Sequence, residues 1–166
     1  MFQTFRGTLF DPAVVSDAGA ATSPPYDVID EAEQESLRLA SPYNVVRLLL
    51  PEGGEERYQR AGAQLRTWLD AGALRADQDR RLYLYQMRWA ADGEDRIALG
   101  VIGALRLTEL GDRVLPHEET MAGPRADRRA VLEATQANID PIIGLSPSRA
   151  LGPLLVPTSP PRVVAL

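Results

Sequence analysis

The pattern of apolar positions along the chain has two periods. The longer one, together with signals of helix starts, predicts three helices. From residue 55 to about residue 72, apolar side chains keep the i, i+3, i+4, i+7 spacing of an amphipathic helix. Asp30, followed three residues later by a glutamate, has the pattern of an N-cap and predicts a helix over about 31–40. Pro124 suits the first turn of a helix, where no backbone N–H is needed, so a third helix is expected over about 124–138.

The shorter period, an alternation of apolar and other residues, predicts strands. Residues 2–10 are expected to form a first strand. The nearly continuous apolar run 45–50 predicts a central strand covered on both faces. The clearest strand signal is a hairpin with arms over 80–90 and 96–108. A short strand is expected over 142–145.

Hydrophobic stripes on the two hairpin arms are expected to form the core of the sheet. Segment 91–95, acidic and containing a glycine, supplies the turn. An aromatic stripe can serve as a stacking platform for nucleic-acid bases, but at strand spacing it is far more often part of a core. The first arm contributes Tyr83, Tyr85, Met87 and Trp89, and the second contributes Ile97, Leu99, Val101, Leu105 and Leu107.

Together these elements predict an α+β fold, with a mixed sheet that has a central hairpin and about three helices packed on it. We expect a single domain over residues 1–145, because the sequence shows no internal repeat and no second core. Residues 146–166 contain five prolines, so neither a long helix nor a central strand fits there. This segment is expected to be a proline-rich C-terminal extension.

Composition narrows the classes of function. The net charge of −5 argues against a protein that coats nucleic acid, because neutralisation of phosphates supplies most of that affinity. The absence of cysteine excludes disulfides, thiolate metal sites and cysteine nucleophiles.

No run approaches the ~20 apolar residues of a membrane span, and no signal-peptide pattern is present, so we expect a cytoplasmic protein. All 18 basic residues are arginine, which we attribute to the codon usage of a GC-rich genome.

Ionisable residues are densest between residues 115 and 129, around the expected start of the third helix. Free backbone N–H groups at a helix start attract phosphate or carboxylate, and Arg125, Arg128 and Arg129 share one side of the helix at i, i+3, i+4. These features predict an anion site. The alternative is a solvated helix face, on which Asp127 or Glu133 pairs with the arginines for a few tenths of a kcal/mol.

The same segment contains candidates for proton transfer and for metal binding. His117 is a candidate general base beside Glu118, because imidazole titrates near pH ~6.5 and a neighbouring carboxylate raises that value. A structural role in a loop is the alternative. Glu118 and Glu119, together with Asp127, are candidate Mg²⁺ ligands, since this hard cation prefers oxygen and often bridges carboxylates to a substrate phosphate. Their spacing matches no recognised metal signature.

Three further polar residues lie on rigid turns, where scaffolds often present contacts to ligands. Tyr26 and Asp27 follow two prolines, and Asn44 follows a Pro-Tyr pair. Turn-forming and capping roles explain them equally well. The usual nucleotidase, dehydrogenase, zincin and serine-hydrolase motifs do not occur, which removes those assignments.

Four sequence blocks resemble the prokaryotic family called domain of unknown function 1015. In chain order they are PPYDVI at 24–29, SPYNVVRL at 41–48, LPHEET at 115–120 and GPRADR at 123–128. The resemblance covers about residues 1–145. That family is distantly similar to the ParB and sulfiredoxin superfamily, which includes nucleotide-dependent enzymes such as a free serine kinase. The resemblance therefore implies phosphoryl transfer or nucleotide hydrolysis.

The chain departs from the family pattern at three points. Longer members carry a downstream Asp-Gly-His-His-Arg motif that this sequence lacks. Lysine is usual where Arg125 stands, and arginine is usual where Glu119 stands. The second difference reverses a charge, so a phosphate facing this loop would meet a carboxylate unless a metal ion intervenes.

These observations lead to three hypotheses, and the sequence does not decide whether the protein is an enzyme. The first is a domain that binds a phosphate-bearing small molecule, such as a nucleotide with Mg²⁺, through Arg125 and Arg128. The second is a non-catalytic module, either a truncated or split half that interacts with a complementary protein chain or a stand-alone interaction domain. The third is DNA binding, which the acidic composition and the lack of a basic recognition helix disfavour. No membrane partner is expected.

Overall fold

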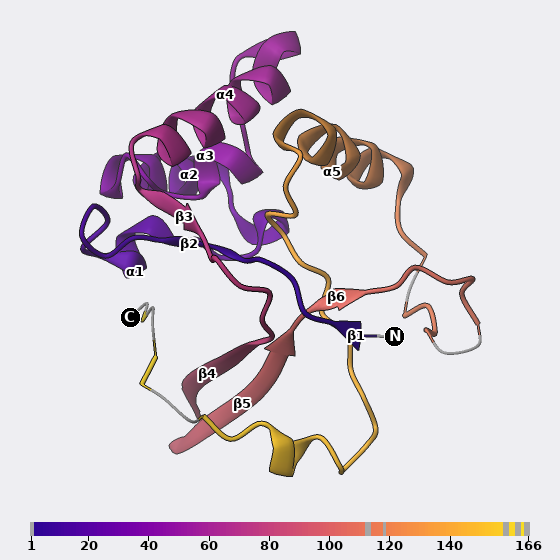
Figure 1. Cartoon of the computed structure of the whole chain (residues 1–166). Coiled ribbons are helices and arrows are strands. Elements are labelled where there is room, and N and C mark those ends of the chain that lie inside the picture. Colours follow the sequence, from indigo (N-terminus) through magenta and orange to yellow (C-terminus); the bar gives the residue numbers. More distant parts are fainter. Residues whose placement is uncertain (1, 112–113, 118, 158–159, 162–163, 165–166) are drawn as a thin grey trace. The chain divides into compact units, whose positions relative to one another are not determined.

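A computed structural model describes the chain except for residues 1, 112–113, 118, 158–159, 162–163 and 165–166 (Figure 1). Contacts divide the chain into two compact units. The hairpin unit comprises Met1–Thr8, Ala76–Pro116 and Ile143–Pro161, and the helical unit comprises Leu9–Arg75, His117–Ile142 and Arg162–Leu166. The expected division into a domain of residues 1–145 and a C-terminal extension stays a prediction.

The helical unit contains the five α-helices of the described residues (Figure 1). They are α1 (Ala18–Ala21), α2 (Glu31–Ala40), α3 (Val46–Leu49), α4 (Arg57–Asp70) and α5 (Ala122–Thr135), with short 3-10 turns η1 (Tyr26–Val28) and η2 (Gly54–Glu56). The three predicted helices are confirmed as α2, α4 and α5. At the start of α2, the Asp30 side chain accepts a hydrogen bond from the backbone N–H of Glu33 at 2.8 Å, as the N-cap pattern predicts.

The predicted central strand over 45–50 is wrong, because this run forms the one-turn helix α3. The Asn44 side chain explains the difference. Its oxygen accepts from the backbone N–H of Val46 at 2.9 Å, and its amide donates to the carbonyls of Ala20 and Thr22, both at 2.8 Å. These bonds start a helical turn beneath α1. A continuous apolar run indicates burial, and here a short buried helix produces the same pattern as a buried strand.

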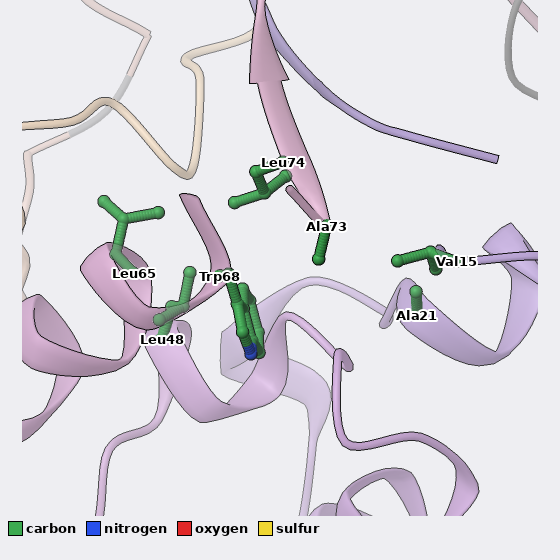
Figure 2. Close-up of a cluster of buried hydrophobic side chains, with 7 residues drawn as sticks. All are labelled: Val15, Ala21, Leu48, Leu65, Trp68, Ala73 and Leu74. Atoms are coloured by element: carbon green, nitrogen blue, oxygen red, sulfur yellow. The ribbon is translucent and has the colours of Figure 1, made fainter. Parts of the chain in front are cut away.

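The core of the helical unit surrounds Trp68, which is 2% exposed. Figure 2 shows the buried cluster, in which Trp68 and Leu65 come from α4 and Leu48 from α3. The rings of Phe10 and Tyr43 lie 6.3 and 6.0 Å from the Trp68 ring. The full cluster is Val15, Ala21, Leu48, Leu65, Trp68, Ala73 and Leu74.

Helices α4 and α5 pack closely because α4 carries a glycine at the contact. A Cβ atom on Gly62 would come within 2.5 Å of the Ala134 carbonyl oxygen. Only a residue without a side chain allows the two backbones to approach this far.

The strands form three two-stranded sheets among the described residues, instead of the single mixed sheet that was expected. The α+β class is confirmed. The predicted first strand divides into β1 and β2, with Phe5 bridging to Arg81 between them, and the predicted strand over 142–145 is absent. The pairs are β1 (Phe2–Gln3) with β6 (Ala104–Leu105), β2 (Thr8–Phe10) with β3 (Leu74–Ala76), and β4 (Tyr83–Ala91) with β5 (Glu94–Ile102).

The predicted hairpin is confirmed as β4 and β5, joined by a two-residue turn. Both turn residues have positive φ, 55° at Asp92 and 77° at Gly93, as a type I′ turn requires. Tyr83 anchors the base of the hairpin, because its hydroxyl accepts from the Gly7 N–H at 2.7 Å and donates to Asp77 at 2.6 Å. Its ring centroid lies 5.1 Å from that of Phe5.

The strand register places the two predicted hydrophobic stripes on opposite faces of the hairpin. Met87 lies opposite Ala98 and Trp89 opposite Arg96, whereas Leu99 lies opposite Gln86. Neighbouring residues of a strand point to opposite faces, so the aromatic stripe and the aliphatic stripe do not face the same side.

The expectation that these stripes form a buried core is wrong, because most of the hairpin side chains are exposed and none of them is fully buried. Trp89 is 44% exposed, and Tyr85 and Leu99 are exposed to a similar degree. A two-stranded ribbon has two faces and no interior of its own. The alternation of apolar residues therefore predicted the strands, but it did not predict whether another element packs on them.

No helix among the described residues is long and apolar enough to cross a bilayer.

Candidate functional site

The start of α4 and the second turn of α5 bring together a cluster of arginine, tyrosine and aspartate side chains. Asp127 and Arg128 lie on α5, and Arg57 and Tyr58 begin α4. The close contact of the two helices at Gly62 sets the distance between these side chains. We call these residues, with Tyr26 from η1, the arginine cluster.

The Asp127 carboxylate is the centre of the arginine cluster. Its Oδ1 accepts a hydrogen bond from the Tyr58 hydroxyl at 2.7 Å and lies 3.4 Å from Nη2 of Arg57. Its Oδ2 accepts from Nε of Arg128 at 3.1 Å and from Nη2 of the same residue at 2.5 Å. The carboxylate thus receives four donor contacts, close to the full capacity of its two oxygens.

Arg128 is the most buried charged group of the cluster, with its side chain 20% exposed. Its Nη2 also donates to the Leu49 carbonyl at 2.5 Å, and its guanidinium carbon lies 4.1 Å from the centre of the Tyr26 ring. Such stacking of a guanidinium on an aromatic face is attractive. Its Nη1 is buried and has no hydrogen-bond partner among the described residues. An unpaired buried donor is unfavourable by about 1–3 kcal/mol.

Electrostatics hold the Asp127 carboxyl in its ionised form. Burial acts to raise its pKa, but the hydrogen bonds from Arg128 and Tyr58 and the nearby Arg57 charge outweigh burial and keep the pKa below its ordinary value. The pKa of Arg57 is raised, chiefly by its 2.6 Å hydrogen bond to the Tyr58 hydroxyl. Two guanidinium groups face one carboxylate, so among the described residues the cluster has an excess of one positive charge.

Of the residues predicted to contact a ligand, the structure brings Tyr26, Asp127 and Arg128 together. Arg125 is exposed in the first turn of α5, and Asp27 is exposed in η1. Asn44 is fully buried, and its side chain is used by the bonds that begin α3, so it is not accessible to a ligand here.

The predicted catalytic and metal-binding residues are untested by the structure. His117 and Glu119 are exposed, and Glu118 lies outside the described residues. Within the described part of the chain, no group of three or more histidine or acidic side chains is arranged to hold a metal ion. Catalysis by His117 or Glu118, and Mg²⁺ binding by Glu118 and Glu119, stay predictions.

Arg57 and Tyr58 were missed by the sequence reasoning, which placed them in the first turn of an amphipathic helix and assigned them no chemistry. They lie about 70 positions from Asp127 along the chain, and only the packing of α4 on α5 brings them to it. No local motif identifies such a partner.

The fold and the arginine cluster define an α+β protein with a partly buried, cationic side-chain cluster between two helices. The chain matches the family model described as "Protein of unknown function (DUF1015)" over residues 2–157 and belongs to that family. Neither the comparison with curated proteins nor the comparison with solved structures finds a match.

Proposed function

We propose that the arginine cluster binds an anionic small molecule that carries a phosphate group. The observation that carries the proposal is an uncompensated positive charge. Among the described residues, Arg57 and Arg128 share one carboxylate partner, Asp127. Arginine forks match the oxygen geometry of phosphate, and such charge-assisted bonds are about twice as strong as neutral ones. The Tyr58 hydroxyl adds a further donor at the same place.

We propose a nucleotide as the form of phosphate, because the resemblance of the sequence blocks to their family implies a distant similarity to the ParB and sulfiredoxin superfamily, which includes nucleotide-dependent enzymes. In this proposal Mg²⁺ joins the nucleotide to Glu118 and Glu119, and His117 or Glu118 handles a proton if a reaction occurs. Arg125, exposed at the start of α5, is available to a second phosphate. The proposal takes the cytoplasm as the compartment.

A thermal-shift titration with inorganic phosphate, ADP and ATP, each with and without Mg²⁺, tests this proposal. A ligand at a hundredfold excess over its Kd stabilises the folded state by about 2.7 kcal/mol, which raises the melting temperature. Arg57→Gln should remove most of the shift in melting temperature, because it removes one of the two positive charges that bind the anion. The Arg57 side chain is 44% exposed, so its loss should not disturb the core.

The matched control is Arg129→Gln, on the same helix as Arg128. Arg129 is exposed and bonds Glu133 at 2.7 Å, so this variant also removes one positive charge but leaves the cluster intact. Equal loss of the shift in both variants would mean that net charge, and not the cluster, attracts the anion. No shift with any of the ligands would reject the proposal.

Protein interaction is a second candidate function, and the exposed hairpin favours it. Both faces of β4 and β5 carry large apolar side chains that are exposed, and among the described residues each strand pairs only with the other. Exposed apolar patches and open strand edges commonly mark surfaces that bind another protein. A complementary protein chain is the partner that this candidate implies, and its role would be non-catalytic.

The accessibility of Trp89 tests the second candidate. The chain has two tryptophans, so comparing the wild type with Trp89→Phe isolates the fluorescence of Trp89. In the monomeric protein this emission should be readily quenched by acrylamide, because an interaction surface must be open before the partner binds. A Trp89 protected from quencher in a monomer would contradict the candidate.

A further inference from the structure

The Asp127 carboxylate occupies the position in the arginine cluster that a bound anion would need. Its two oxygens engage both guanidinium groups and the Tyr58 hydroxyl. Carboxylate and phosphate present similar oxygens to an arginine fork, so the side chain and an external anion compete for the same donors.

We propose that Asp127 is a built-in competitor that keeps the affinity of the arginine cluster for external anions low. This inference rests on the proposed function, because it sets the strength of binding at the same site. Asp127 therefore acts as a specificity-determining residue: a ligand must supply more charge or more donor-matched oxygens than one carboxylate to displace it. A phosphate or pyrophosphate meets that requirement, and a monocarboxylate does not.

The geometry shows where displacement begins. Among the donor contacts to Asp127, the one from Arg57 is the longest at 3.4 Å, whereas the shortest contact from Arg128 is 2.5 Å. The Arg57 and Asp127 side chains are 44% and 31% exposed, so solvent reaches the weak side of the cluster. An anion can therefore bind Arg57 first, while Arg128 remains held by the Leu49 carbonyl and stacked on Tyr26.

The charge count gives the direction of the effect. With Asp127 ionised, two guanidinium groups and one carboxylate leave one positive charge. With a neutral residue at this position, both positive charges are available to a ligand. Removing a like charge a few ångströms from a bound anion strengthens binding, and at a partly exposed site the gain is roughly tenfold.

Asp127→Asn tests the inference, with inorganic pyrophosphate as the probe and isothermal titration calorimetry at fixed ionic strength as the measurement. The amide keeps the shape of the side chain and its oxygen can still accept from Tyr58. We expect the Kd for pyrophosphate to fall roughly tenfold relative to the wild type. Glu133→Gln is the matched control, because it removes one carboxylate of α5 outside the cluster. Its Kd should stay within about twofold, since an exposed charge is screened by solvent.

Other outcomes separate the inference from the proposed function. If the wild type binds pyrophosphate and Asp127→Asn binds it equally or more weakly, Asp127 is no competitor, although the anion site stands. If neither protein binds, the proposed function fails and the inference fails with it. Asp127→Ser is a second neutral variant in case the asparagine variant does not fold. If both variants are unfolded, the carboxylate is required by the fold and the inference is overturned.

Discussion

The two tryptophans show how differently the two units use their hydrophobic residues. Trp68 in the helical unit is 2% exposed and is packed in the buried cluster, whereas Trp89 in the hairpin unit is 44% exposed. Both lie in strongly patterned segments. The difference teaches that a periodic pattern reports which face of an element is apolar, and that burial depends on whether another element is placed against that face.

The largest expected effect is on stability, when each of the two tryptophans is replaced by alanine. Trp68→Ala should destabilise the helical unit by about 3–5 kcal/mol, because it leaves a cavity in a packed core. Trp89→Ala should change stability by less than about 1 kcal/mol, because the residue is 44% exposed and lies outside the buried cluster. Urea unfolding followed by far-ultraviolet circular dichroism measures both. Equal losses would show that Trp89 is buried in solution.

A smaller effect is expected at the contact between α4 and α5. Gly62→Ala would place its Cβ against the Ala134 carbonyl and should cost about 1–3 kcal/mol, as overpacking does. Gly123→Ala is the control, because nothing lies within 4 Å of its added Cβ. Since Gly123 is in α5, alanine there should leave stability unchanged or raise it by up to about 1 kcal/mol. Both are measured by chemical denaturation, and a harmless Gly62→Ala would mean that the helices are farther apart.

In the hairpin unit, Tyr83→Phe tests how much the hydrogen bonds of the Tyr83 hydroxyl contribute to stability. The change removes the hydroxyl that accepts from Gly7 and donates to Asp77, and it should cost about 1 kcal/mol. Amide hydrogen exchange at Gly7 should accelerate in the variant, while exchange within α4 stays the same. Faster exchange in both places would indicate that the two units unfold together.

The smallest expected effect is the contribution of Asp127 to the pH dependence of the free energy of unfolding. Because the folded protein lowers the pKa of this carboxyl, its contribution to stability is complete above the unfolded value of about 3.9. The contribution is lost as pH falls below that value and through the lower folded pKa. Urea midpoints of the wild type should therefore fall more steeply than those of Asp127→Asn below about pH 4. Parallel curves would show that the carboxyl is not held by the cluster.

The sequence allowed the helices to be predicted well, because their signals are local. The N-cap at Asp30 and the apolar spacing of α4 act within a few residues, and both elements lie close to where they were expected. The run 45–50 was misassigned because a short, nearly continuous apolar run shows no period that distinguishes a helix from a strand. For β4 and β5 the strands were correct, but the register, which decides the faces, depends on the exact turn at Asp92 and Gly93.

The candidate site was predicted only in part for a similar reason. Asp127 and Arg128 stand next to each other in a dense charged segment, so they were found from the sequence. Arg57 and Tyr58 reach them only through helix packing, which no spacing in the sequence encodes. Asn44 looked equally suitable for a ligand, but the structure uses its side chain to organise the backbone of its own unit.

The backbone contact at Gly62 also bears on the spacing of the arginine cluster. Helix α4 rises about 6 Å between Tyr58 and Gly62, and α5 rises about 10 Å between Asp127 and Ala134, so the contact lies within about two helical turns of the cluster on both helices. A side chain at position 62 would push the two backbones apart at this point. It would therefore lengthen the hydrogen bond between Tyr58 and Asp127, although neither residue touches Gly62.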